Sequence, residues 1–241
     1  MNGKCHPMNR RLSCILVLLV IPLFLSSMIV ISWADDINPG VFPINSKPYG
    51  LTYGEWSAKW WQWAISIPID ENPMLDGTGE KCTKSQTNPN VFFLFGAGGG
   101  QVERTCTIPA GKAIMIPILA VECSYAEFPQ LKTEADLHKC AKDDQDTVLN
   151  VDLTVDGVNF RDLKEKYRTH SNLFNVTFPA NNIFGVEPPT TSQAVSDGFF
   201  ILLEPLKEGN HEIHFKGVQG SYTVTSPQHY ADDVKYNLIV R

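Results

Sequence analysis

The stretch Leu149-Asn-Val-Asp-Leu-Thr-Val-Asp-Gly-Val158 alternates apolar and polar residues and then turns back on itself. Successive side chains of a β-strand point to opposite faces, so the leucines and valines up to Val155 face one side and the polar residues face the other. Asp156-Gly157 is a dipeptide that favours a two-residue hairpin. The stretch therefore predicts an antiparallel strand pair with one buried face.

Short segments of the same kind recur along the rest of the chain. The run at residues 113–119 is apolar throughout, which predicts burial on both faces, and Pro117 within it predicts an edge or a bulge. Regularly spaced strands predict a mainly β fold, an antiparallel β-sandwich or jelly roll. The further predicted strands span residues 91–95, 102–108, 173–178, 199–203, 211–215, 222–225 and 234–240.

A tryptophan-rich helix is predicted before these strands. Thr52 and Glu55 have the spacing of a capping box, and Pro68 ends the helix after about residue 67. Trp61 projects about 100° away from the stripe that the other indoles share. A second, short helix is predicted at residues 134–142, capped by Thr133 and tethered through Cys140. The stripe of indoles, interpreted as core, consists of Trp56, Trp60 and Trp63.

The beginning of the chain has the pattern of an export signal. Basic residues precede an apolar run over residues 12–33, and the small-residue exit Ser32-Trp33-Ala34 follows. Residues 1–34 are therefore predicted to be a signal peptide, with an uncleaved signal anchor as the alternative because the run is long enough to span a bilayer. Residues 35–241 form one extracytoplasmic domain in this interpretation, with a subdivision near residue 145 as the alternative.

Charge restricts the classes of partner. The formal net charge is −6, and no cluster of lysine or arginine follows the leader. Such a chain lacks the basic surface that binds nucleic acid or anionic lipid. We therefore expect no nucleic-acid partner, and membrane contact only through the N-terminal segment.

Four cysteines follow the leader, and an even number in an exported chain favours disulfides. Sequential pairing is predicted because each pair brackets a compact local unit, although the sequence permits three connectivities. No Cys-x2-Cys spacing or nearby histidine indicates zinc, so no metal site is predicted. The two predicted bonds are Cys82–Cys106 and Cys123–Cys140.

Three stretches together resemble an uncharacterised family of exported prokaryotic proteins that has no known function. The first carries the pattern E-W-x3-W-W-x-W and the second the pattern R-x-C-x-I-P-A-G-K. The resemblance spans most of the chain after the leader and implies one extracytoplasmic unit, but it implies no catalytic residue. The stretches are residues 54–63, residues 104–112, and residues 197–206 continuing to 211–215.

Trp61 is the first candidate binding residue. An indole ring that is not part of the core stripe offers a flat platform for a sugar ring. The sequence therefore predicts carbohydrate binding at Trp61, with a place in the core as the alternative.

Arg104 is the second candidate, because it shares the apolar face of its predicted strand. A buried charge needs a partner, and Glu122 at the end of the next strand is the predicted one. The alternative is a pocket in which Arg104 and Lys112 bind an anionic group.

These features predict a non-catalytic extracytoplasmic binding or cell-surface protein, with a carbohydrate or another envelope component as its partner. No catalytic residue is predicted. A secreted hydrolase that uses carboxylates in a cleft near Glu55, Arg104 and Glu122 is the first alternative. A purely structural envelope protein is the second.

Two further features complete the predictions. Acidic loops at residues 70–80 and 143–146 indicate at most weak calcium binding, and no other cofactor is expected. Asn175-Val176-Thr177 is a candidate N-glycosylation sequon.

Overall fold

The computed structural model describes residues 40–187, 190–220 and 230–241. The chain divides into two units, Met1–Asp35 and Asp36–Arg241, and the described residues belong to the second. The predicted leader and the strand predicted at residues 222–225 lie outside the described residues. Within them, no helix is both long enough and apolar enough to cross a membrane.

The described strands form two sheets. Sheet A has the order β1-β3-β8-β6, and β7 also pairs with β8. Its strands are β1 (Val91–Phe93), β3 (Ala113–Ser124), β6 (Arg168–His170), β7 (Phe174–Phe178) and β8 (Thr190–Leu203). Sheet B has the order β2-β10-β9-β4-β5. Its strands are β2 (Gly100–Ile108), β4 (Val148–Val155), β5 (Val158–Asn159), β9 (Gly209–Gln219) and β10 (Tyr230–Val240).

The predicted mainly β sandwich is confirmed, but its sheets are mixed rather than wholly antiparallel. β1 pairs with β3 in parallel, and β2 pairs with β10 in parallel. The last strand inserts between β9 and β2, so it runs antiparallel to one neighbour and parallel to the other. Alternation along a strand reports which face is buried and carries no information about the direction of the neighbouring strand.

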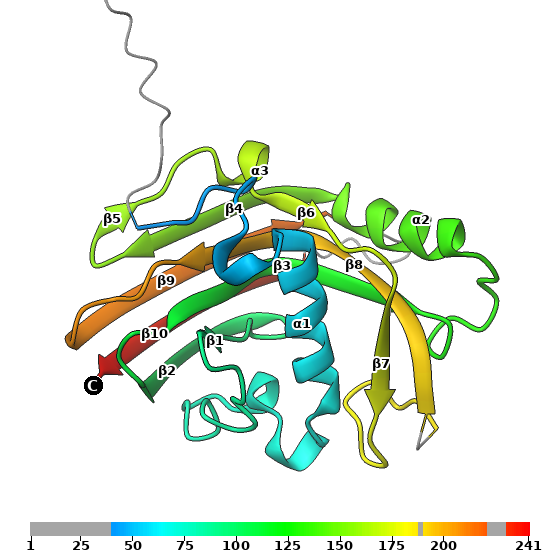
Figure 1. Ribbon diagram of the computed structural model, residues 1–241, viewed down its shortest axis with the longest axis horizontal. Coiled ribbons are helices and arrows are strands. Elements are labelled where there is room, and N and C mark those ends of the chain that lie inside the picture. The colour runs from blue at the N-terminus through cyan, green and yellow to red at the C-terminus, as the bar shows by residue number, and fades with distance from the viewer. Residues whose placement is uncertain (1–39, 188–189, 221–229) are drawn as a thin grey trace, which may run out of the picture. The chain divides into compact units, whose positions relative to one another are not determined.

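Sheet A lies between a helix and sheet B (Figure 1). On one face, Trp60 of α1 (Tyr53–Ser66) contacts Phe200 of β8, with ring centroids 6.1 Å apart. On the other face, Leu119 of β3 packs against Gly217 of β9. The short helices are η1 (Pro48–Gly50), η2 (Ile69–Glu71), η3 (Pro73–Leu75) and α3 (Leu163–Lys166).

The first predicted helix is confirmed in position and capping. Thr52 Oγ1 accepts a hydrogen bond from the Glu55 N–H, and the Glu55 carboxylate accepts one from the Thr52 N–H. The stripe of indoles is core, as predicted, because each ring is buried and its Nε1 donates to a main-chain carbonyl. The donor and acceptor pairs are Trp56 with Pro48, Trp60 with Leu94, and Trp63 with Lys84.

Two bulges adjust the strand registers. The pairing of β3 with β8 shifts between Pro117 and Leu119, which confirms the irregularity predicted at Pro117. A second shift lies between Val148 and Asn150 of β4. Because of this shift Leu149 is 52% exposed, so its predicted place on the buried face of β4 was wrong.

Both predicted disulfides are present, Cys82–Cys106 and Cys123–Cys140. The second joins β3 to helix α2 (Glu134–Gln145), which begins at the predicted cap Thr133. α2 packs on β3 and β8 through a small separate apolar cluster, which includes Leu137, Ala141 and Val195.

Replacing Cys123 and Cys140 by serine is expected to lower the free energy of unfolding by about 3 kcal/mol, because the bond closes a short loop in the unfolded chain. Urea unfolding followed by circular dichroism measures the change. The double variant at Cys82 and Cys106 is the comparison, with a similar expected loss. An unchanged unfolding midpoint in either variant contradicts the expectation.

Candidate functional site: a cavity at the free edge of β3

β3 has a free edge along its second half. β1 pairs only with Ala113, Ile114 and Met115, and the last hydrogen bond from this side joins the Leu94 N–H to the Met115 carbonyl. No other described strand pairs with that edge of β3. Among the described residues, the edge beyond Met115 therefore lacks a neighbouring strand.

A cavity of about 360 Å³ lies against this edge. Five consecutive residues of β3, from Pro117 to Val121, line it. Only alternate residues of a strand face one side of a sheet, so a run of five consecutive lining residues means that the cavity meets the strand edge-on. The remaining walls come from α1, residues 74–98, the end of α2 and the cavity-facing ends of β9 and β10; they include Trp60, Trp61, Asp144, Gln219, Tyr230 and Asp232.

The hydrogen-bonding register shows which main-chain groups of β3 point to the free edge. The Ser171 N–H donates to the Ser196 carbonyl at 2.9 Å, and the Ser196 N–H donates to Ser171 Oγ at 2.8 Å. The N–H and C=O of Ser196 thus point away from β3. Ser196 and its register partner Glu122 are therefore a non-hydrogen-bonded pair, in which the N–H and C=O of Glu122 point away from β8. The next such pair joins Ala120 and Gly198. The N–H and C=O groups of Ala120 therefore point to the free edge.

Solvent exposure agrees with this orientation. Ala120 and Val121 are half-buried, whereas every other residue of β3 is buried. A Cβ at Gly198 would lie 2.6 Å from the Ala120 Cα, so a glycine is needed for this close approach of β8. Ala120 and Val121 are therefore the accessible part of the free edge.

Two carboxylates stand at the cavity. Asp232 accepts hydrogen bonds from the Ala97 N–H at 3.1 Å and the Gly99 N–H at 2.7 Å, which fixes the loop before β2. Asp144, at the end of α2, accepts a hydrogen bond from Gln219 Nε2 at 2.9 Å. No described lysine, arginine or histidine forms an ion pair with either carboxylate. Within the part of the chain that the structure describes, no cation balances these two carboxylates.

Trp61 lies at the cavity but is not an exposed platform. The Trp61 ring contacts the rings of Trp60 and Phe184, at centroid distances of 4.8 Å and 6.4 Å. Only 8% of Trp61 is exposed, and its buried Nε1 has no hydrogen-bond partner. The core alternative holds for most of the ring, while one part of it forms a wall of the cavity. Tyr230, which is 41% exposed, is the more accessible aromatic residue there.

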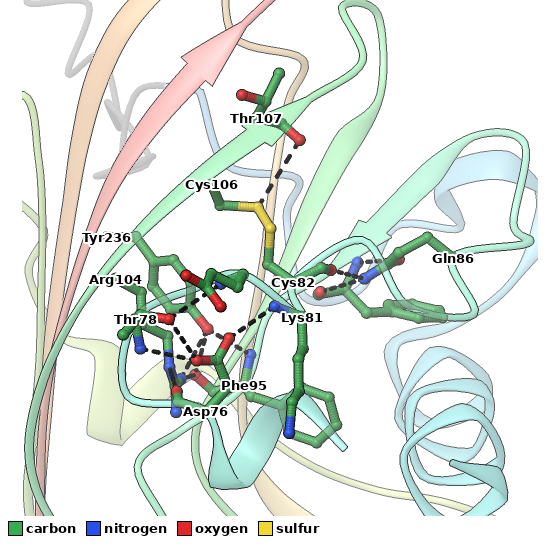
Figure 2. Close-up of a disulfide and its surroundings, with 12 residues drawn as sticks. Asp76, Thr78, Lys81, Cys82, Gln86, Phe95, Arg104, Cys106, Thr107 and Tyr236 are labelled. Atoms are coloured by element: carbon green, nitrogen blue, oxygen red, sulfur yellow. Dashed lines mark hydrogen bonds between the residues drawn. A yellow bond between two sulfur atoms is a disulfide. The ribbon is translucent and has the colours of Figure 1, made fainter. Parts of the chain in front are cut away.

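Arg104 does not form the predicted ion pair with Glu122. Its guanidinium donates to main-chain carbonyls and to the hydroxyl of Tyr236, as Figure 2 shows in part beside the Cys82–Cys106 disulfide. Arg104 belongs to sheet B and Glu122 to sheet A, so the strand neighbours assumed from the sequence are in different sheets. The carbonyls are those of Asp76 (2.6 Å), Phe95 (3.0 Å), Gly96 (2.9 Å) and Met74 (3.2 Å).

The predicted anion pocket and the predicted hydrolase cleft are not formed either. Arg104 is 1% exposed and its donors are engaged, while Lys112 donates to the Asn88 carbonyl at 2.6 Å. Glu55 is exposed and completes the capping box of α1 with Thr52. No hydrogen bond or ion pair joins any two of the residues assigned to these sites, because each serves a different local structure.

Glu122 is a buried carboxyl group beside a second one. It is 3% exposed, and neither of its oxygens receives a hydrogen bond from an N–H or hydroxyl donor. Burial raises its pKa well above the ordinary value, and the nearby Glu127 carboxyl raises it further. Ser124 Oγ donates to Glu127 at 2.7 Å, so Glu127 has a donor of its own. This environment therefore favours the protonated form of Glu122.

Replacing Glu122 by glutamine is expected to raise the melting temperature at pH 8 and to leave it unchanged at pH 4. The raised pKa means that folded Glu122 keeps its proton above pH 4.5, the ordinary pKa of the group, where the unfolded chain has lost its own. Stability therefore falls as the pH rises from about 4.5 through the raised pKa. Scanning calorimetry at both pH values measures the difference, and exposed Glu204 is the control. An equal gain at both pH values contradicts the expectation.

The remaining predicted sites are simple to place. Asn175 is an exposed residue of β7, and its carbonyl accepts a hydrogen bond from Gln62 Nε2. Its glycosylation stays a prediction.

Within the described residues, no three histidine, cysteine, aspartate or glutamate side chains gather where they could hold a metal ion. The sequence did not indicate the cavity itself, because strand pairing and the sites where it ends are tertiary features.

Comparison with known proteins adds little. No family model matches the chain, and no curated protein matches it. The solved structure of PbICP-C in complex with falcipain-2 is 11% identical with a TM-score of 0.23, and the solution structure of amebosin is 11% identical with a TM-score of 0.17. Each alignment covers 63% of this chain and 99% of the other chain. Both TM-scores are too low to indicate a shared fold.

Proposed function

We propose that this protein is a non-catalytic extracytoplasmic binding protein whose ligand occupies the cavity at the free edge of β3. The observation that carries the proposal is the combination of an unpaired strand edge, an aromatic wall and two carboxylates around one cavity. Binding sites typically combine apolar walls with a few placed polar groups in this way. Main-chain groups without a strand partner supply further donors and acceptors.

The cross-links support the compartment in this proposal. Two disulfides suggest an oxidising, extracytoplasmic environment. The predicted leader agrees with export and supports secretion or a cell-surface position as part of the proposal. Membership of the exported family that the three stretches resemble is proposed on the same ground.

The ligand class that the sequence predicted was carbohydrate. A neutral sugar has hydroxyl groups that suit the carboxylates of Asp144 and Asp232, but the low exposure of Trp60 and Trp61 leaves little indole face for stacking. Carbohydrate binding therefore stays a prediction. The residues assigned to the hydrolase alternative are not assembled, and no observation favours a purely structural role.

Titration of the intrinsic tryptophan emission tests the proposal, since Trp60 and Trp61 both line the cavity. The probes are neutral oligosaccharides and capped synthetic peptides. We expect one class to shift the emission, and Tyr230→Ala to weaken that binding about fivefold because it removes an aromatic wall. Tyr49→Ala is the matched control, because Tyr49 is 42% exposed and lies outside the cavity. No shift with any probe, or equal effects of both variants, contradicts the proposal.

A further inference from the structure

We propose that the cavity binds an extended polypeptide segment with a basic side chain, which joins sheet A as a strand beside β3. This inference rests on the proposed function and names its ligand class. Recognition of this kind uses main-chain hydrogen bonds at a sheet edge for affinity and pockets for alternate side chains for specificity.

Within the stretch of β3 that lines the cavity, Ala120 is the residue whose main chain can form such pairing. Ala120 points both its N–H and its C=O to the free edge, so one residue of an incoming strand can exchange two hydrogen bonds with it. Pro117 is the preceding residue whose main chain points to this edge. Because proline has no N–H, it leaves no donor unpaired there. The stretch from Pro117 to Val121 that lines the cavity spans roughly 16 Å at about 3.3 Å per residue, which suits a short strand rather than a whole domain.

Side-chain room exists on the α2 side of the edge. A second cavity of about 450 Å³ shares Val121 and Asp144 with the first, so the two are neighbours. Phe128 and Leu131 give it an apolar wall. Because side chains of a strand alternate, a peptide paired with Ala120 would direct every second side chain toward this cavity. The second cavity therefore accommodates an apolar side chain of the bound segment.

Charge selects the other side chains. Asp144 and Asp232 lack a cationic partner among the described residues, whereas Asp143 nearby is already paired with Lys139. A lysine or arginine of the ligand would supply the missing charge at Asp144, and an acidic peptide would be repelled. The negative net charge of the chain acts in the same direction. The complementary ligand is thus an extended, basic segment.

The test adds a capped heptapeptide, in which valine and lysine alternate, to the full-length protein. Amide hydrogen exchange is read by NMR with and without the peptide. We expect exchange at the Ala120 amide to slow at least about tenfold, because a hydrogen bond now protects it. The amides of Val121 and Cys123, which point to β8, are the internal control and stay unchanged.

Variants of the peptide test the same contacts without changing the protein, so they cannot impair its folding. Methylation of the backbone nitrogens along one edge of the peptide removes its donors, and binding should weaken at least about tenfold. Replacing the lysines of the peptide by glutamate should abolish binding. Asp144→Asn should weaken the lysine peptide about threefold and leave an uncharged threonine peptide unaffected.

The outcomes separate this inference from the function on which it rests. If an oligosaccharide binds at the cavity and the peptide does not, the proposed function holds and the peptide inference is wrong. Peptide binding that leaves the Ala120 amide unprotected, or that tolerates N-methylation, also overturns the strand-addition mode. If no probe of either class binds, both proposals fail.

Discussion

Replacing Arg104 by methionine is expected to lower the free energy of unfolding by about 3–5 kcal/mol, the largest effect among the polar residues. The guanidinium is buried and holds four main-chain carbonyls, two from residues 74–76 and two from residues 95–96. Methionine fills a similar volume but leaves these acceptors without donors, and each buried unsatisfied group costs free energy. The turn that carries Asp76 and the end of the loop at Gly96 should loosen together.

Urea unfolding of the Arg104→Met variant measures this loss. Lys112→Met is the matched control, since Lys112 is half-buried and donates a single hydrogen bond. We expect it to cost less than about 1 kcal/mol. If the Arg104 variant keeps the stability of the parent protein and loses only ligand binding, the structural assignment of Arg104 is wrong.

Replacing Trp60 by alanine is expected to lower the free energy of unfolding by about 3–5 kcal/mol as well, because it leaves a cavity in a close-packed core. Trp60 is 4% exposed and its Nε1 donates to the Leu94 carbonyl at 2.8 Å. It joins α1 to both β8 and the segment after β1. Its ring lies within 4.8–6.2 Å, centroid to centroid, of the rings of Trp61, Trp63, Phe95 and Phe200.

Trp60→Phe separates packing from hydrogen bonding. The phenyl ring keeps most of the aromatic contacts and loses only the bond to Leu94, so its cost should be about 1 kcal/mol. Chemical denaturation at a fixed temperature compares the two variants. Equal losses in both would mean that the hydrogen bond rather than ring packing holds the helix, contrary to the expectation.

Local features were predictable where their cause lies within a few residues. The capping boxes at Thr52 and Thr133 depend on side chains three positions apart, so the beginnings of both long helices could be placed. Pro117 cannot donate to a ladder, and the bulge lies there. Both disulfides connect cysteines that are close in sequence, 24 and 17 positions apart.

Other features depend on partners that the sequence does not specify. The partners of Arg104 are mostly main-chain carbonyls, and every residue has one, so no residue type marks them in advance. A buried arginine in a sequence favours a carboxylate as its partner, and the prediction of Glu122 was wrong for this reason. The free edge of β3 arises because β1 ends at Phe93, although the apolar run that contains it continues to Phe95. Leu94 and Phe95 are buried as that run predicts, and Leu94 still donates its N–H to Met115. Their carbonyls, however, accept from Trp60 of α1 and from Arg104, so the pairing with β3 ends there.

Gly217 connects the two layers of the sandwich to the shape of the cavity. A Cβ at this position would lie 2.3 Å from Leu119 Cγ, so the absence of a side chain in β9 sets how closely β3 can approach sheet B. Leu119 also lines the cavity. Gly217 itself does not line the cavity, yet even one added methyl group there would displace β3 and alter the fit of whatever binds.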